Sequence, residues 1–352
     1  MASARWTALA LVVALAAGVA GCGSSGTQGT DVKKVAFVAP YRDNEPDWTV
    51  QAQEVVSEWV RKGRVRVDTV DASQTSDIRG VFEQVSHEGN QLVIAHDSRY
   101  ADAAEAAAEK TRVPELVWGE RTDAPKGLVG EITMPDASAG AYMAGLVTAK
   151  AAYARRLGIV VIADGSTWDT ATWNRMAGAF IAGARSIDPR EKFYYTQVGE
   201  DGTATVQDVH DATRRQIGEG AQMVFALGGA ATVGALRALT EAGGEDQYVG
   251  VIGDKASFNT DNNVLVSVMI DTRPVFEQAL RDVRTGRFGE HPYKLTLANR
   301  GIWLYQTGRT PADAYEAGIR AGPKVVSGRI KVPDTPTRES VDALLAGETP
   351  EG

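Results

Sequence analysis

A short apolar strand that ends in a polar, ring-rich loop and leads into a helix is the feature that most constrains this chain. Residues 35–38 read Val-Ala-Phe-Val, a run typical of a strand buried on both faces of a sheet. The loop that follows holds Tyr41, Asp43, Asp47 and Trp48, and helical spacing of apolar residues begins directly after it. This is the first unit of a doubly wound α/β sheet, which binds ligands in the crevice beyond the carboxyl ends of its strands.

The same unit recurs at a spacing of about 30 residues, which predicts parallel strands joined by right-handed crossovers. In the first half of the chain, buried strands are expected at residues 35–38, 65–70, 92–95, 116–118 and 128–132. In the second half, they are expected at residues 158–162, 193–197, 223–227 and 248–252. Helices fill the intervals, and the helix expected at 136–152 carries small residues that allow close packing, namely Ala139, Gly140, Ala144 and Gly145.

A chain of this length exceeds what one hydrophobic core usually supports, so two lobes are expected. We assign to an N-terminal lobe residues 33–133 and about 256–288. We assign to a C-terminal lobe residues 134–255 and about 289–332.

The strand expected at 264–270 is interpreted as a crossover that returns to the first lobe. Residues 293–298 and 302–305 are candidates to pair with each other, and residues 333–352 are expected to form a disordered tail.

The first residues predict the compartment. Arg5 precedes an apolar stretch, residues 6–20, that is too short to span a bilayer comfortably, so residues 1–21 are interpreted as a signal peptide. The sequence Val-Ala-Gly-Cys ending at Cys22 matches the bacterial lipoprotein processing box, and residues 22–32 form a flexible tether. We expect lipidation of Cys22, with the protein anchored on the extracytoplasmic face of the cell membrane. The alternative is an ordinary secretory peptide with an incidental cysteine.

Composition excludes several classes of function. The net charge of −8 argues against a nucleic-acid partner, and no second apolar stretch is long enough to cross a membrane. His96 and Asp97 form the one suggestive pair among four scattered histidines, but no nucleophile elbow or metal-ligand spacing accompanies them. We therefore expect neither an enzyme nor a bound metal or cofactor.

Several ordered segments carry a resemblance to a known family. They are Lys34 with the strand after it, Asp102, residues 136–145 (DASAGAYMAG), residues 176–183 (MAGAFIAG), Gly228-Gly229, and residues 250–254. Their order and spacing resemble the basic membrane protein family, purine-nucleoside-binding lipoproteins of ABC importers. The resemblance covers residues 35–288 and implies the type I periplasmic-binding-protein fold, with two α/β lobes joined by several chain crossings.

The resemblance implies binding roles for residues of both lobes. Trp48 holds the place of the aromatic residue that stacks on the base; alternatively it is the first buried residue of its helix. Asp97 and Tyr100 follow the third strand, and Tyr100 and Asp102 match the family's aromatic and acidic positions there. Asp102 either accepts hydrogen bonds from a base or stabilises the start of its helix. Gly228-Gly229 matches the double glycine where the backbone approaches the ligand.

The chain also departs from the family pattern. The family holds ribose hydroxyls with an Asp and a Lys, whose places are taken here by Ile252 and Ile270. Asp254 or Asp271 would substitute if the alignment shifts by one or two residues.

The second-lobe loop has gained Trp168 and Trp173, which either line the pocket or pack on the surface of the lobe. Such a pocket suits a nucleoside, a free base, or another flat or cationic ligand. The expected function is that of a lipoprotein that closes two lobes on this ligand and delivers it to an ABC permease. The alternative is a ligand-sensing lipoprotein of the same fold that acts in signalling.

Overall fold

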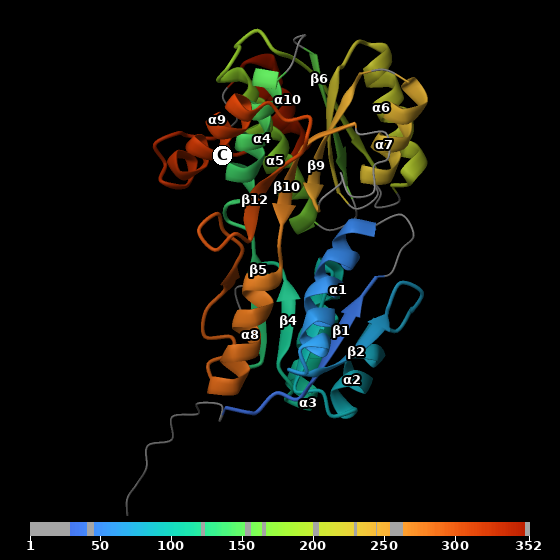
Figure 1. Ribbon diagram of the computed structural model, residues 1–352. Coiled ribbons are helices and arrows are strands. Elements are labelled where there is room, and N and C mark those ends of the chain that lie inside the picture. The colour runs from blue at the N-terminus through green and yellow to red at the C-terminus, as the bar shows by residue number, and fades with distance from the viewer. Residues whose placement is uncertain are drawn as a thin grey trace, which may run out of the picture.

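The computed structural model describes residues 29–40, 46–120, 124–151, 156–163, 167–199, 204–228, 231–243, 245–253 and 263–348. These residues form two α/β lobes stacked along the long axis of the molecule (Figure 1). Within them, each lobe has a six-stranded sheet with helices on both faces. The expected doubly wound α/β class is confirmed.

The first lobe is built on a parallel sheet with the strand order β11-β5-β4-β3-β1-β2. Its strands are β1 (Lys34–Ala39), β2 (Arg66–Asp71), β3 (Leu92–Ala95), β4 (Glu115–Trp118), β5 (Val129–Thr133) and β11 (Tyr293–Lys294). One face is covered by α1 (Pro46–Arg61) and α8 (Arg273–Thr285). The other is covered by α2 (Ile78–His87) and α3 (Ala101–Thr111). Burial on both faces explains why β1 is almost entirely apolar.

The second lobe repeats this plan with the order β12-β10-β9-β8-β6-β7, in which β12 alone runs antiparallel to its neighbour within the described sheet. Its strands are β6 (Arg156–Ile162), β7 (Lys192–Val198), β8 (Met223–Leu227), β9 (Gln247–Ile252), β10 (Val264–Ile270) and β12 (Ile302–Gln306). One face packs on α4 (Ala137–Ala151), α5 (Thr167–Arg185) and α9 (Ala312–Val326). The other packs on α6 (Val206–Gly218) and α7 (Ala231–Ala242).

Three placements differ from those expected. Strand β10 belongs to the second sheet, where it pairs with β9 and β12. The expected pairing of 293–298 with 302–305 is wrong, because β11 pairs with β5 in the first sheet and β12 pairs with β10 in the second. The expected disorder of the tail is also wrong, since Arg338–Ala346 forms α10.

The described chain passes between the lobes at residues 134–136, 271–272 and 295–301, which we call the hinge segments. The backbone N–H of Leu297 donates to the Asp136 carboxylate at 2.8 Å, and that of Asp271 donates to the Gly301 carbonyl at 2.8 Å. These bonds tie the hinge segments to one another. None of the helices described in the structure is both long and apolar enough to span a bilayer.

Glu115, at the start of β4, is a buried carboxyl group with no cationic partner among the described residues, and burial raises its pKa well above the usual value. The Ser86 hydroxyl donates to Oε1 at 3.3 Å, while Oε2 has no hydrogen bond to any part of the chain that the structure describes. The protonated form is therefore the one that the folded state favours. As pH rises past the pKa of the unfolded chain, ionisation stabilises only the unfolded state, so stability falls.

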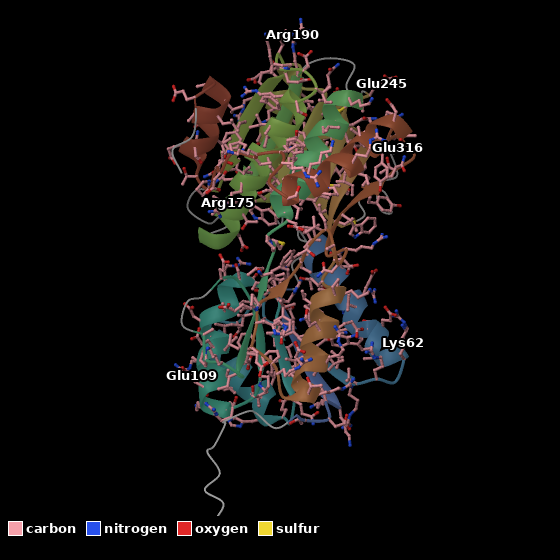
Figure 2. All side chains as sticks on the ribbon, turned by 90° about the vertical axis from the view of Figure 1, so that its left-hand side faces the viewer. Lys62, Glu109, Arg175, Arg190, Glu245 and Glu316 are labelled. Carbon is pink, nitrogen blue, oxygen red and sulfur yellow. The ribbon has the colours of Figure 1, made fainter. Side chains whose placement is uncertain are left out.

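Glu115→Gln is thus expected to leave stability nearly unchanged near pH 4. Above that pH, it is expected to raise stability relative to the wild type by about 1.4 kcal/mol per pH unit until the folded-state pKa is reached. Urea unfolding at several pH values measures this difference. Glu109→Gln on the surface (Figure 2) is the charge-matched control. A wild-type-like pH profile for Glu115→Gln would contradict the neutral carboxyl group.

Candidate functional site

The carboxyl ends of the strands of the two lobes face each other across the space between them. Figure 1 shows β4 pointing toward the second lobe, and β9 and β10 pointing toward the first. In the first lobe this edge is formed by the residues that follow β1, β3 and β4, and in the second by those that follow β6, β8 and β9. It is the edge at which doubly wound sheets bind their ligands.

Trp48 lies at this edge, in the first turn of α1, and its side chain is half-buried. The neighbouring Thr49 hydroxyl donates to the Pro40 carbonyl at 2.6 Å, which fixes the start of α1 to the end of β1. The Trp48 ring stacks on His96, with 4.9 Å between ring centroids, and meets the Trp118 ring at 4.6 Å. The Trp48 ring therefore packs on other rings, as expected of a buried residue of its helix. It is also partly accessible, as expected of a residue that stacks on a ligand.

His96 follows β3 and is fully buried beneath Trp48. Its Nδ1 accepts from Trp118 Nε1 at 3.3 Å, so its Nε2 carries the proton that it donates to the Trp48 carbonyl at 2.9 Å. Trp48 Nε1 in turn donates to the His96 carbonyl at 3.2 Å. Burial lowers the pKa of His96 to about 4, so the imidazole is neutral at physiological pH.

The turn after β3 holds three residues predicted to bind ligand. Asp97 is buried and caps this turn: its carboxylate accepts from the Arg99 backbone N–H at 2.9 Å and from Arg99 Nε at 2.8 Å. The Tyr100 ring packs edge-on against Phe82, with 6.0 Å between centroids, in the core beneath α2 and α3. Asp102 is exposed in the first turn of α3. The structure therefore does not gather these three side chains around Trp48.

A side-chain hydrogen bond joins the two lobes at this edge: the Ser98 hydroxyl, after β3, donates to the Asp169 carboxylate in the first turn of α5. Ser98→Ala is expected to shift the unliganded protein toward an open arrangement by about 1–2 kcal/mol, because the bond forms only when the lobes approach. Small-angle X-ray scattering should show a larger radius of gyration. Ser186→Ala, which removes a hydroxyl bond to the Gly183 carbonyl at the C-terminal end of α5, is the control. Equal radii for all three proteins would mean that the bond does not hold the lobes.

Trp173 and Gly228 come from the second lobe. The Trp173 ring is 4% exposed and packs in the hydrophobic core, while its Nε1 has no hydrogen bond within the described structure. Gly228 follows β8 with φ of +111°, and a Cβ there would lie 2.6 Å from the Ile162 Cβ. Both its backbone conformation and its surroundings require glycine at this position.

The ends of β9 and β10 present apolar side chains. Ile252 and Ile270 are both buried, and β9 and β10 pair in parallel with Met269 opposite Ile252. Ile252 has φ of +79°, and the Gly253 N–H donates back to the Val251 carbonyl at 3.2 Å, which makes a γ-turn. A β-branched residue in this region is strained, and such strain is concentrated at ligand clamps and active sites.

The remaining predicted residues lie outside the described part of the chain. They are Cys22, Tyr41, Asp43, Gly229 and Asp254, together with the side chains of Asp47 and Trp168. Asp271, the alternative ribose partner, is placed in a hinge segment, where its carboxylate accepts from the Arg273 backbone N–H at 2.9 Å. The described residues contain no group of His, Cys, Asp and Glu side chains suited to a metal ion.

Sequence reasoning missed Trp118 and the pair formed by Ser98 and Asp169. In the sequence, Trp118 was recognised only as the last residue of an expected strand. Its position at the end of that strand would have placed it at the site. It ends β4, the neighbour of β3, so it must lie beside the residues that follow β3. The bond between Ser98 and Asp169 had no signal in the sequence, because it depends on how the two lobes are oriented.

Comparison with known proteins gives one family. Residues 32–335 match the family described as ABC transporter substrate-binding protein, PnrA-like. No curated protein is similar enough in sequence to count as a relative.

Several solved structures share the fold. An ABC transporter solute-binding protein from Conexibacter woesei is 21% identical, with a TM-score of 0.68, and the match covers 86% of this chain and 99% of that one. One from Aeropyrum pernix is 14% identical, with a TM-score of 0.72 and coverage of 90% and 96%. A transcriptional activator of the comK gene from Bacillus halodurans is 14% identical, with a TM-score of 0.68 and coverage of 86% and 99%. These matches confirm the type I periplasmic-binding-protein fold.

Proposed function

This chain belongs to the family of PnrA-like ABC transporter substrate-binding proteins, and we propose that its own ligand is a flat, ring-bearing compound of the nucleoside or purine class. Proteins of this family bind small molecules outside the cytoplasm and work with ABC transporters. In our proposal the ligand enters between the lobes, which close about the hinge segments and bury it at the facing strand ends. The loaded protein then delivers it to the permease.

The observation that carries the proposal is the half-buried Trp48 ring at the carboxyl edge of the first sheet, backed by His96 and Trp118. A rigidly held indole face contributes about 1–3 kcal/mol to binding a stacked base. Tyr41 and Trp168 are proposed to add further ring area, and Trp173 Nε1 is a buried donor without a partner in the described structure.

Mass spectrometry of the compound that co-purifies with the protein tests the proposal directly. The expected result is a purine, a nucleoside or a similar planar ring compound. A sugar or an aliphatic amino acid bound with micromolar or better affinity would refute the proposed ligand class, although membership of the family would stand.

The sugar requirement is a sharper test. Ile252 and Ile270 offer no hydrogen bond to a ribose hydroxyl, which would lose its water without replacement. We therefore expect inosine, 2′-deoxyinosine and hypoxanthine to bind within about tenfold of one another, which corresponds to about 1.4 kcal/mol. Isothermal titration measures the three affinities. A strong preference for inosine would mean that a polar residue such as Asp254 or Asp271 holds the sugar.

Cys22 is proposed to carry the lipid anchor, as its processing box and the tether after it suggest. Two acyl chains give stable attachment, whereas one gives marginal attachment. Cys22→Ser is expected to move the protein from the detergent phase to the aqueous phase or to leave it unprocessed. Partitioning identical to that of the wild type would exclude the anchor and leave the binding function untouched.

A further inference from the structure

Trp48, His96, Trp118, Phe37 and Phe276 form a ring cluster beneath the proposed ligand. The contacts within it are more specific than ligand binding alone requires. The His96 backbone N–H donates to the Val38 carbonyl at 2.8 Å, which extends the pairing of β3 with β1 by one residue. Phe37 and Phe276 pack on the imidazole, with ring centroids at 5.2 and 6.2 Å. His96 is therefore held by the sheet on one side and by α8 on the other, independently of α1.

Trp48 stands in the first turn of α1, which the Thr49 hydroxyl ties to the Pro40 carbonyl at 2.6 Å. Three further contacts join Trp48 to His96: the Nε1 bond to the His96 carbonyl, the bond from His96 Nε2 to the Trp48 carbonyl, and the stacked ring pair. Trp118 locks the imidazole in the orientation that makes the second of these bonds.

We propose that His96 is a positioning residue that fixes the Trp48 ring for ligand stacking, with Trp118 fixing His96 in turn. The proposal rests on the proposed function, in which Trp48 is the stacking ring. It assigns to His96 no contact with the ligand and no proton transfer. Its effect on affinity is exerted through the orientation of Trp48, because a ring that is already fixed loses less conformational entropy on binding.

The arrangement also indicates which ligands the surface formed by Trp48, backed by His96 and Trp118, can select. Trp48 Nε1 and both imidazole nitrogens are engaged inside the cluster, and the imidazole is neutral. This surface therefore offers a ligand the π face of Trp48, which discriminates among ligands by their planarity and size. Selection among rings with different hydrogen-bonding edges must come from other parts of the cleft.

Three variants separate the two hydrogen bonds of the imidazole. His96→Gln keeps a side-chain N–H within reach of the Trp48 carbonyl, in the place of Nε2. His96→Asn keeps an oxygen near the place of Nδ1, where it can accept from Trp118. His96→Phe keeps a ring for stacking and removes both bonds. His210→Gln is the control, because His210 is also buried and hydrogen-bonds to other side chains through both ring nitrogens, but lies in α6 of the second lobe.

Two readouts are needed. The first is the circular-dichroism exciton couplet of the unliganded protein, which two indoles in contact produce and which Trp48→Phe identifies by its loss. The second is the affinity for inosine and hypoxanthine, measured well below the melting temperature of each variant. We expect His96→Phe and His96→Asn to lose the couplet and to bind about 5- to 150-fold more weakly, whereas His96→Gln keeps the couplet and loses less than about fivefold. His210→Gln should match the wild type in both.

Each alternative outcome is informative. Wild-type affinity and couplet in folded His96→Asn or His96→Phe would refute the positioning role. Equal losses in His96→Gln and His96→Asn would refute it as well, because a residue that merely fills space does not depend on which bond is kept. If the wild type binds neither probe, the proposed ligand class fails, and the couplets of the variants still decide whether His96 positions Trp48.

Discussion

Replacement of Gly145 by alanine is expected to destabilise the second lobe by about 3 kcal/mol or more, with no change in any ligand contact. Gly145 lies in α4 where that helix crosses α5, and a Cβ at this position would collide with the Phe180 carbonyl oxygen. The opposing Gly183 of α5 is placed in the same way, since its Cβ would collide with the Tyr142 carbonyl oxygen. The two helices thus meet through their backbones, and an added methyl group can be accommodated only by moving one helix.

Gly218→Ala is the matched control for this experiment. Gly218 is also a helical glycine, at the end of α6, but nothing lies within 4 Å of a Cβ placed there. Alanine at this site should be neutral or should stabilise by up to about 1 kcal/mol. Denaturant unfolding of both variants measures the difference. A loss of less than 1 kcal/mol for Gly145→Ala would show that the α4–α5 contact is looser than the structure describes.

The close α4–α5 contact was predictable, because small residues recur along residues 136–145 and 176–183. The strands were also predictable, because an apolar run of the length of one strand, followed by a polar loop, forms few other structures in an α/β chain. The sheet to which β10 belongs was not predictable. Its seven residues are fully buried, as they would be in either sheet, and only pairing with β9 and β12 assigns it.

Helix α10 was missed because its stability comes from tertiary contacts. It has nine residues, fewer than an isolated helix needs, and its one fully buried side chain is Val341. The Arg185 guanidinium of α5 donates to the carbonyls of Leu344 and Leu345 at 2.8 and 3.2 Å, which satisfies the free end of the helix. Nearby, Arg175 (Figure 2) donates to Asp334 at 2.8 Å and holds the segment that leads into α10.

The site was harder to predict than the fold, because strand ends indicate which residues lie at an edge but not where their side chains point. Tyr100 illustrates this: it follows β3 as expected, yet a 3₁₀ turn at Ser98–Tyr100 brings its ring against Phe82 in the core. His96 illustrates the reverse. It was considered only as half of a possible catalytic pair with Asp97, whereas its imidazole hydrogen-bonds to Trp48 and to Trp118.

Trp48→Ala is expected to weaken binding of a planar ligand by about 1–3 kcal/mol, or about 5- to 150-fold, because the stacking face is lost. It should also lower stability, since the ring covers His96 and Trp118. That loss should fall below the roughly 3–5 kcal/mol of a fully buried tryptophan, because Trp48 is half-buried. Titration with inosine and hypoxanthine, beside an unfolding curve, separates the two effects.

Trp59→Ala is the control, on the same helix and about 16 Å further along it. The Trp59 ring is buried and its Nε1 donates to Glu277 Oε1 at 2.7 Å, on the side of α1 that packs against α8. This variant should lose about 3–5 kcal/mol of stability while its folded fraction binds normally. If Trp48→Ala behaves like Trp59→Ala, with a full core penalty and unchanged affinity, then Trp48 belongs to the core and the ligand is held elsewhere. If it loses affinity while Trp59→Ala does not, the ring at the head of α1 is the stacking surface.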